Sequence, residues 1–389
     1  MTSKGILGAI VAGLMLGTAA TSAHADITVG FITSQTGPVS SIGIPYARGV
    51  AAGQAFISEV DGQKFKVISL DDASDPSTAA KNARKLIEED KVDVIIGTAG
   101  APATAAIIAA ASELKVPVLA PTPVPSVPQV DGKPWAISTP QSPKDMVGLL
   151  IDEAKLQGIK TLGFIGFSDA WGDLVYNNGK TAADAAGIQI VTNERYARAD
   201  TSVSAQVLKV MAAKPEGFLA GGSGTGGALP FTGLAERGFK GKLFGPPSLI
   251  NPDFVRLAGK SAEGLIASTG PIMVVEQLPD AHPTKAIGLK YKEVHMKANN
   301  VASNDGFAPY SFDCWLILAE ASKRALKTAK PGTQEFRNAL RDEVYKTKEL
   351  VGTHGVYNYT PASHFGTDRR ALVLVTLTDG NWKFYKTGN

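Results

Sequence analysis

The stretch ITVGFITSQTGP, residues 27–38, sets a pattern that most of the chain repeats. It begins with a nearly continuous apolar run and ends in the turn signal Thr36-Gly37-Pro38, and residues 43–60 have the composition of a helix. A strand, a loop and a helix are therefore predicted in that order. Because the run is apolar throughout rather than alternating, it indicates a strand of a parallel sheet that is covered on both faces.

The alternation of strands and helices continues to about residue 140. Asp75 is predicted as an N-cap, and Pro76 follows at the first helical position, where the missing N–H of proline costs nothing. A proline-rich loop over residues 121–140 closes this unit. Such a pattern predicts an α/β fold around a parallel sheet. The further strands predicted here are residues 65–70, 92–97 and 116–120.

The middle of the chain repeats the pattern and predicts a second α/β unit. Residues 282–341 are predicted to be mostly helical, and residues 372–377 and 382–385 form a predicted hairpin around Asp379-Gly380. Late helices that return to the first unit imply several crossovers, and therefore two hinged lobes with a cleft between them. Ligands of such sheets bind beyond the carboxyl ends of the strands. The strands predicted for the second unit are residues 161–166, 188–192, 217–220 and 242–245.

The composition limits the possible functions. The chain has 389 residues, of which 44% are apolar and 19% charged, and its formal net charge is +3. At roughly 100 to 200 residues per domain, two or three cores are expected. The near-balance of charge gives no reason to expect nucleic acid as a partner. The single cysteine, Cys314, excludes an internal disulfide and a thiolate metal cluster, and it is predicted to be a buried, inert thiol.

Residues 1–25 have the features of an export signal. Lys4 precedes an apolar run at residues 6–16, and the small residues of Ala23-His24-Ala25 stand directly before Asp26. The run is shorter than the roughly 20 residues that span a bilayer, so it is not expected to be a membrane anchor. No cysteine stands at the cleavage site to carry a lipid. We therefore predict cleavage after Ala25 and a soluble, periplasmic mature protein.

Several segments then resemble one known family, the leucine/isoleucine/valine-type periplasmic binding proteins of ABC transporters. The resemblance extends in order along nearly the whole mature chain. It implies the type I fold, in which two α/β lobes, each with a parallel sheet, are hinged by three crossovers. The segments that carry it are residues 27–49, with Thr36-Gly37-Pro38, and DDASDPSTAA at 71–80, VDVIIG at 92–97, FSDAWG at 167–172 and GVYNYTP at 355–361.

The resemblance also implies a lobe division, a mechanism and partners. Closure of the lobes would bury a small-molecule ligand, and the loaded protein, expected to be a monomer, would deliver it to an ABC permease and its ATPase. A sensor module on the same fold stays a less favoured alternative. The expected division places residues 26–142 and 270–345 in the first lobe, and residues 143–269 and 346–389 in the second.

At the ligand positions the chain departs from the amino-acid binders of this family. Gly100 and Ala101 stand where those proteins have a serine pair for the ligand carboxylate, although backbone N–H groups at a helix N-terminus still bind anions. Thr122 and Pro123 belong to the run after the fourth strand, in which Val124 stands where those proteins have a threonine hydroxyl. The acid that pairs with the ligand ammonium is replaced by Pro247. An unpaired buried ammonium costs several kcal/mol, which argues against a standard amino acid.

We therefore expect a small apolar or aromatic carboxylate as the ligand, with branched-chain or other amino acids as the alternative. The loop of residues 221–225 looks like the second-lobe loop of aromatic-acid binders in the same family. The residues predicted to contact the ligand through polar groups or loop backbone are Gly100, Ala101, Thr122, Pro123, Ser223, Gly224, Pro247 and Ser248, and the apolar or aromatic walls are predicted at Ile42, Trp171 and Phe307.

Other motifs do not lead to a cofactor or an enzyme. The glycines of residues 222–227 match G-x-G-x-x-G, but the acidic residue required about 20 positions later is absent from residues 244–247. The histidines of the mature chain lack metal-ligand spacing, and there is no nucleophile elbow. The sequence thus predicts no metal site, no cofactor and no catalytic residues. The alternative from a different functional class is an extracytoplasmic enzyme built on the same scaffold.

Overall fold

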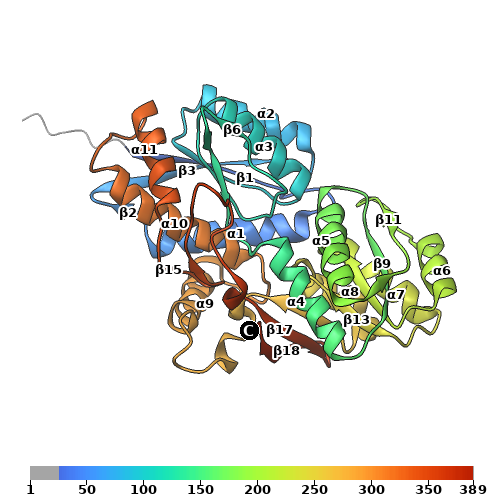
Figure 1. Cartoon of the computed structure of the whole chain (residues 1–389). Helices are drawn as coiled ribbons and strands as arrows, with labels where there is room; N and C mark the ends of the chain where they lie inside the picture. The colour runs from blue at the N-terminus through green and yellow to red at the C-terminus, as the bar shows by residue number, and fades with distance from the viewer. Residues whose placement is uncertain (1–25, 389) are drawn as a thin grey trace, which may run out of the picture.

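The computed structural model describes residues 26–388, and the predicted export signal, 1–25, lies outside them. Two separate sheets, each covered by helices, form two lobes side by side (Figure 1). The predicted two-lobed type I fold is therefore confirmed. The helices are α1 (Ser40–Phe56), α2 (Pro76–Glu88), α3 (Ala101–Glu113), α4 (Pro143–Leu156), α5 (Ala170–Ala186), α6 (Ser204–Ala213), α7 (Leu229–Glu236), α8 (Pro252–Ala258), α9 (Lys285–Asn299), α10 (Ala308–Ala325) and α11 (Gln334–Tyr345).

The first sheet has the strand order β2-β3-β1-β4-β5-β8 and is parallel apart from the short antiparallel edge strand β2. The N-cap expected before α2 is present, because Asp75 Oδ1 accepts a hydrogen bond from Thr78 N at 2.7 Å. β8 lies inside the proline-rich segment that was expected to be a loop, because the prolines around it were interpreted as loop signals. The strands are β1 (Ile27–Thr33), β2 (Glu59–Val60), β3 (Gln63–Asp71), β4 (Val94–Gly97), β5 (Val118–Ala120) and β8 (Ala136–Ser138).

The second sheet has the order β10-β9-β12-β13-β14-β17-β18, with β11 also paired to β9. The last two strands form the predicted antiparallel hairpin, and both Asp379 and Gly380 have positive φ in its turn. β11 and β14 were not predicted, because β11 consists of Glu194-Arg195-Tyr196 without an apolar run and β14 has only two apolar residues, Ile266 and Ala267. The strands are β9 (Thr161–Phe167), β10 (Gln189–Ile190), β11 (Glu194–Tyr196), β12 (Gly217–Gly221), β13 (Lys242–Gly245), β14 (Ile266–Thr269), β17 (Val373–Thr378) and β18 (Asn381–Thr387).

Part of the segment 346–389 packs differently from the expected lobe division. Residues 346–389 were expected in the second lobe, and their hairpin β17–β18 does join the second sheet. However, Tyr357 and Tyr359 are fully buried in the core of the first lobe. The Tyr359 hydroxyl donates to the Ser138 carbonyl at 3.0 Å, which fixes this segment against the end of the first sheet. The chain therefore crosses to the second lobe only shortly before β17.

Three passages of the chain connect the lobes: β8 to α4, β14 to α9, and the residues that lead into β17. They are in contact with one another. Gln141 Nε2, in the first passage, donates to the Ala371 carbonyl of the third at 2.7 Å. A Cβ atom on Gly270, in the second passage, would lie only 1.8 Å from Nδ1 of His354. Glycine is therefore required where these two segments meet.

A buried acid ties the third passage to α10. Asp313 accepts hydrogen bonds from the backbone N–H groups of Thr353 and His354, at 2.8 and 3.0 Å, and from the hydroxyls of Thr353 and Tyr357, at 2.9 and 2.7 Å. Burial nevertheless raises the pKa of Asp313 to about 6. Tyr310 stacks on His354 with ring centroids 3.6 Å apart. We call Gln141, Tyr310, Asp313, Thr353, His354 and Tyr357 the crossover cluster.

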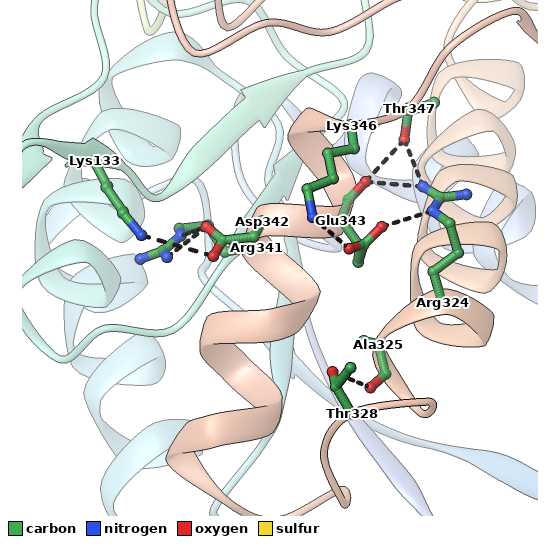
Figure 2. A network of polar contacts seen from close by, with 9 residues as sticks. All are labelled: Lys133, Arg324, Ala325, Thr328, Arg341, Asp342, Glu343, Lys346 and Thr347. Carbon is green, nitrogen blue, oxygen red and sulfur yellow. Dashed lines mark hydrogen bonds and ion pairs between the residues drawn. The ribbon is translucent and has the colours of Figure 1, made fainter.

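The two late helices α10 and α11 are joined by a half-buried polar network, shown in Figure 2. Arg324 donates to the Glu343 carboxylate at 2.9 Å and to its backbone carbonyl at 2.8 Å, and Lys346 pairs with the same carboxylate. Arg341 lies over the ring of Trp135, 4.3 Å from its centroid, next to β8. These contacts hold the late helices on the first lobe, as the sequence predicted.

Candidate ligand-binding cleft

A cleft lies between the two lobes at the carboxyl ends of the strands. Its first wall, from the first lobe and the first passage, combines aromatic rings with a few hydroxyls. Its second wall comes from the loops after β9, β11, β12 and β13, together with α4. The first wall consists of Ile42, Tyr46, Gly100, Ala101, Pro121, Thr122, Pro123, Pro140, Phe307 and Tyr310, and the second wall of Met146, Trp171, Arg198, Ser223, Pro247 and Ser248.

Ten of the eleven predicted ligand-contacting residues line this cleft, and their contact with a ligand stays a prediction. Gly224 is not among the lining residues. It has φ of 53°, and a Cβ there would lie 2.6 Å from Ser41 Oγ and 3.4 Å from the Ile42 side chain. Gly224 therefore permits the close approach of the two lobes, since any side chain at this position would separate them.

Six lining residues were not predicted from sequence: Tyr46, Pro121, Pro140, Met146, Arg198 and Tyr310. Arg198 follows the short strand β11, so its position beyond a strand end was the signal that could have found it. Tyr46 and Tyr310 stand in helices, where apolar spacing marks them as ordinary core residues. Only the packing shows that part of each ring faces the cleft.

The hydroxyls of the first wall are occupied as hydrogen-bond donors. Tyr46 Oη donates to the Pro121 carbonyl at 2.5 Å, and Thr122 Oγ1 donates to the Thr98 carbonyl at 2.7 Å. Burial raises the pKa of Tyr46, so its hydroxyl stays neutral. Each hydroxyl has a single proton, and both protons are already used. The two oxygens also lie 3.1 Å from each other, so neither hydroxyl has a free proton for a ligand.

Helix α3 begins at the first wall. Gly100 is its N-cap residue, with φ of 83°, and Pro102, in the first turn, has no N–H to offer. Thr104 N already donates to the Gly100 carbonyl. The anion-binding capacity predicted for Gly100 and Ala101 thus depends on few free amides.

The second wall contains a positioned guanidinium. Arg198 Nε pairs with Asp169 Oδ2 at 2.5 Å, its Nη1 donates to Ser223 Oγ at 3.0 Å, and its Cζ lies over the Phe167 ring, 4.3 Å from the centroid. Asp169 Oδ1 in turn caps α5 by accepting from Trp171 N and Gly172 N. The Arg198 side chain is 18% exposed. Three partners therefore fix its orientation before any ligand binds.

The remaining lining is mainly apolar or has its polar groups satisfied. The Trp171 indole N–H and the Ser248 hydroxyl both donate to the Gly222 carbonyl, at 3.1 and 2.8 Å. Phe307 packs edge-on against Tyr46, with centroids 6.1 Å apart. Tyr310 Oη donates to Gln141 Oε1 at 2.7 Å. Tyr310 thus belongs both to the cleft and to the crossover cluster.

Beside the cleft, the two lobes are joined by a hydrogen bond to a helix carbonyl that has no helical donor because of a proline. Within α1, the Ser41 carbonyl would normally accept from the N–H of residue 45, but that residue is Pro45. Asn251 of the second lobe donates its Nδ2 to this carbonyl at 2.6 Å. Asn251 Oδ1 simultaneously caps α8 by accepting from Asp253 N. The structure therefore has the lobes closed on each other at this edge.

Features of other protein classes are missing from the described part of the chain. Within residues 26–388, no group of three or more His, Cys, Asp or Glu side chains is placed to hold a metal ion. No helix in that range has the length and apolarity needed to cross a membrane. Cys314 is buried, and burial raises the pKa of its thiol, which keeps it protonated.

Comparison with known proteins identifies relatives of this fold. The sequence profile of the family described as "Periplasmic binding protein" matches residues 26–379. A crystal structure of an extracellular ligand-binding receptor from Rhodopseudomonas palustris HaA2 is 40% identical, with a TM-score of 0.89, over 93% of this chain and all of that one. The Leu/Ile/Val-binding protein BraC3 of Rhizobium johnstonii is 24% identical over 92% of this chain and 93% of its own length.

A more distant solved structure shares the fold with an aromatic ligand in place. It is a solute-binding protein of an ABC transporter from R. palustris in complex with benzoate. Its TM-score is 0.78 at 20% identity, and the match covers 93% of this chain and 96% of that one. At this identity the likeness concerns the fold.

Proposed function

The chain belongs to the periplasmic binding protein family, and from that premise we propose that it is a solute receptor for a small apolar or aromatic carboxylate. One observation carries the choice of ligand: among residues 26–388, no Asp or Glu side chain lines the cleft. An α-ammonium group buried there would lack a counter-charge, which costs several kcal/mol. An aromatic acid without an amino group avoids this cost and matches the aromatic and proline-rich lining.

The proposed mechanism is a shift between open and closed lobes. Ligand contacts both walls only when the lobes are closed, so binding favours closure by its difference in affinity for the two states. Closure also brings Asn251 to the Ser41 carbonyl. The closed form then offers an ABC permease and its ATPase a surface that the open form lacks. The receptor works without a cofactor and without covalent chemistry.

Location, oligomeric state and lobe division are part of the same proposal. We infer export with cleavage after Ala25 and action in the periplasm as a monomer. The first lobe is taken as residues 26–142 and 270–345, with the segment around Tyr357 added because it packs there. The second lobe is residues 143–269 with the hairpin β17–β18.

A second ligand class is supported by a specific feature of the first wall. Tyr46 and Thr122 line the cleft, and their hydroxyl oxygens could accept hydrogen bonds from an ammonium group. Branched-chain amino acids are therefore the alternative, in line with the name of the R. johnstonii relative.

A screen of aryl acids against amino acids tests the proposal. Benzoate, phenylacetate and 3-phenylpropanoate are compared with L-leucine by thermal shift, and scattering measures the radius of gyration. We expect at least one acid to raise the melting temperature and to compact the protein, and L-leucine to do neither. A strong response to L-leucine alone would favour the second ligand class. A tight ligand that leaves the radius of gyration unchanged would contradict the closure mechanism.

A further inference from the structure

We propose that Arg198 and Ser223 hold the carboxylate of the ligand, so that its acid end lies on the second wall. This inference rests on the proposed function, because it assumes that the cleft takes an acid. It reverses the position that the family resemblance implies, in which the carboxylate meets the first lobe at Gly100 and Ala101.

The first reason is charge. Among the residues the structure describes, Arg198 is the only charged side chain that lines the cleft. A guanidinium has five N–H donors in a planar fork that matches a carboxylate. Only Nε and Nη1 have hydrogen-bond partners within residues 26–388, namely Asp169 and Ser223. Nη2 is left to donate to a ligand.

The second reason is that Ser223 adds a free proton next to this guanidinium. Its Oγ accepts from Arg198 Nη1 at 3.0 Å, and within the described residues the hydroxyl donates to no other group. Hydroxyl and guanidinium donors therefore stand together on one side of the cleft. Both are mostly buried, Ser223 with 7% exposure, so a charge-assisted hydrogen bond there is strengthened by the low local dielectric.

The third reason is that the first wall disfavours a carboxylate. Tyr46 and Thr122 have used their protons on backbone carbonyls, so neither hydroxyl has a proton to offer a ligand. A carboxylate has acceptors only, and beside these two hydroxyls it would meet oxygen atoms without free protons. Only the few free amides at the start of α3 would remain as donors on this wall. The acid end of the ligand is therefore directed to the opposite wall.

The salt bridge with Asp169 leaves Arg198 able to bind the carboxylate of a ligand. Asp169 Oδ1 is engaged by two N–H groups at the start of α5, where the helix dipole also favours negative charge. Its other oxygen holds Arg198 Nε. The acid thus orients the guanidinium, while the ring of Phe167 supports one face of it. Such a preorganised donor loses little entropy when a ligand binds.

The test compares each acid with its uncharged analogue. Affinities of benzoate, phenylacetate and 3-phenylpropanoate and of their primary amides are measured by calorimetry for the wild type and for Arg198→Gln. For each acid that binds, the substitution should weaken binding about 100-fold, while binding of the amide changes about threefold at most. Arg198→Lys keeps the positive charge without the planar guanidinium, so its affinity for the acids should lie between those of the wild type and Arg198→Gln.

Two further variants keep the test decisive. Arg195→Gln removes a neighbouring arginine that pairs with Asp173 and stacks on Phe164 but does not line the cleft, and it should leave acid affinity unchanged. Ser223→Ala removes the hydroxyl while leaving Arg198 paired with Asp169. It should weaken acid binding roughly fivefold, with the melting temperature of the free protein nearly unchanged, so it serves if Arg198→Gln folds poorly.

The outcomes separate this inference from the proposed function. If Arg198→Gln and Ser223→Ala both keep the wild-type preference for acid over amide, the inference is wrong and the acid lies at the start of α3. If no acid binds but L-leucine does, the inference fails while the receptor function stands. If neither the acids nor L-leucine bind, both the inference and the proposed ligand classes fail.

Discussion

A charged side chain stands at the centre of two polar clusters, Arg198 on the second wall of the cleft and Asp313 at the crossovers. The two side chains differ in how many of their hydrogen-bonding groups the protein itself engages. In the crossover cluster, Asp313 accepts four hydrogen bonds from Thr353, His354 and Tyr357. On the second wall, Arg198 keeps N–H groups that no residue in the range 26–388 engages. The satisfied Asp313 carboxylate stabilises the fold, although His354 Nδ1 of the same cluster has no hydrogen-bond partner within residues 26–388, whereas unsatisfied donors in a cleft are available to a ligand. The predictions below test this distinction.

The largest effect is expected from removing Asp313. Asp313→Ala leaves two buried backbone N–H groups and two hydroxyls without their acceptor, and each unsatisfied group is costly. The free energy of unfolding should fall by roughly 3 to 5 kcal/mol, measured by denaturant titration at pH 5. A loss below about 1 kcal/mol would show that the cluster rearranges, and it would remove the contrast with Arg198.

The second prediction concerns pH. Burial raises the folded-state pKa of Asp313 to about 6, above the unfolded value of 3.8, so the folded state binds the extra proton between these values. The contribution of Asp313 to stability is thus fully present below about pH 4 and is lost as the pH rises through 6. It amounts to roughly 2 to 3 kcal/mol.

Asp313→Asn provides the comparison for this pH effect. Its side chain does not titrate, so the difference in unfolding free energy between wild type and variant should shrink or turn against the wild type from pH 4 to pH 7. The facing His354 stays neutral over this range, since burial lowers its pKa to about 3. Parallel stability curves for the two proteins would show that the Asp313 pKa is not raised.

The third prediction uses Tyr310, which belongs to both regions. Tyr310→Phe keeps the stack on His354 but leaves Gln141 Oε1 without its donor, which should cost about 1 to 2 kcal/mol of stability. Because the ring also lines the cleft, affinity for the best aryl acid should change as well. Calorimetry and thermal melts measure both.

Tyr345→Phe is the matched control for Tyr310→Phe. Its hydroxyl donates to the Ala136 carbonyl in the first lobe, and the residue is not among those lining the cleft. It should lower stability to a similar extent with ligand affinity unchanged. Equal affinity losses in both variants would mean that the effect of Tyr310→Phe comes from general destabilisation of the first lobe.

The smallest effect is expected at the contact between the lobes. Asn251→Asp keeps an oxygen to cap α8 but replaces the amide that donates to the Ser41 carbonyl. Closure then costs more, so apparent affinity for an aryl acid should fall about tenfold, equal to about 1.4 kcal/mol, with little change in the stability of the free protein.

Asn299→Asp is the control for Asn251→Asp. Asn299 Nδ2 donates to the Arg48 carbonyl at 3.1 Å within the first lobe, so its loss should not affect closure. Unchanged affinity in Asn251→Asp would indicate that the Ser41 contact contributes nothing to the closed state.

Much of the fold could be predicted from local sequence, and most of the cleft lining from the family resemblance. Apolar runs, turn signals and caps such as Asp75 gave the order of strands and helices, and the fold class followed from that order. The resemblance to a known family then pointed to Thr122, Trp171 and Ser223, which lie just after strands of the parallel sheets, where ligands bind. Strands without an apolar run, such as β11, were missed, and β8 was missed among prolines that signal a loop, although the equally short β5 was predicted.

The sequence by itself determined which segments become strands, helices and cleft loops, since these depend on neighbouring residues and on the order of elements. Only the tertiary structure decided which polar groups remain free to bind. The Tyr46 hydroxyl donates to a carbonyl 75 residues away, and Gln141 donates to one 230 residues away. Hydrogen-bonding capacity is what remains after distant partners have been satisfied, so no local pattern can reveal the free donors of Arg198.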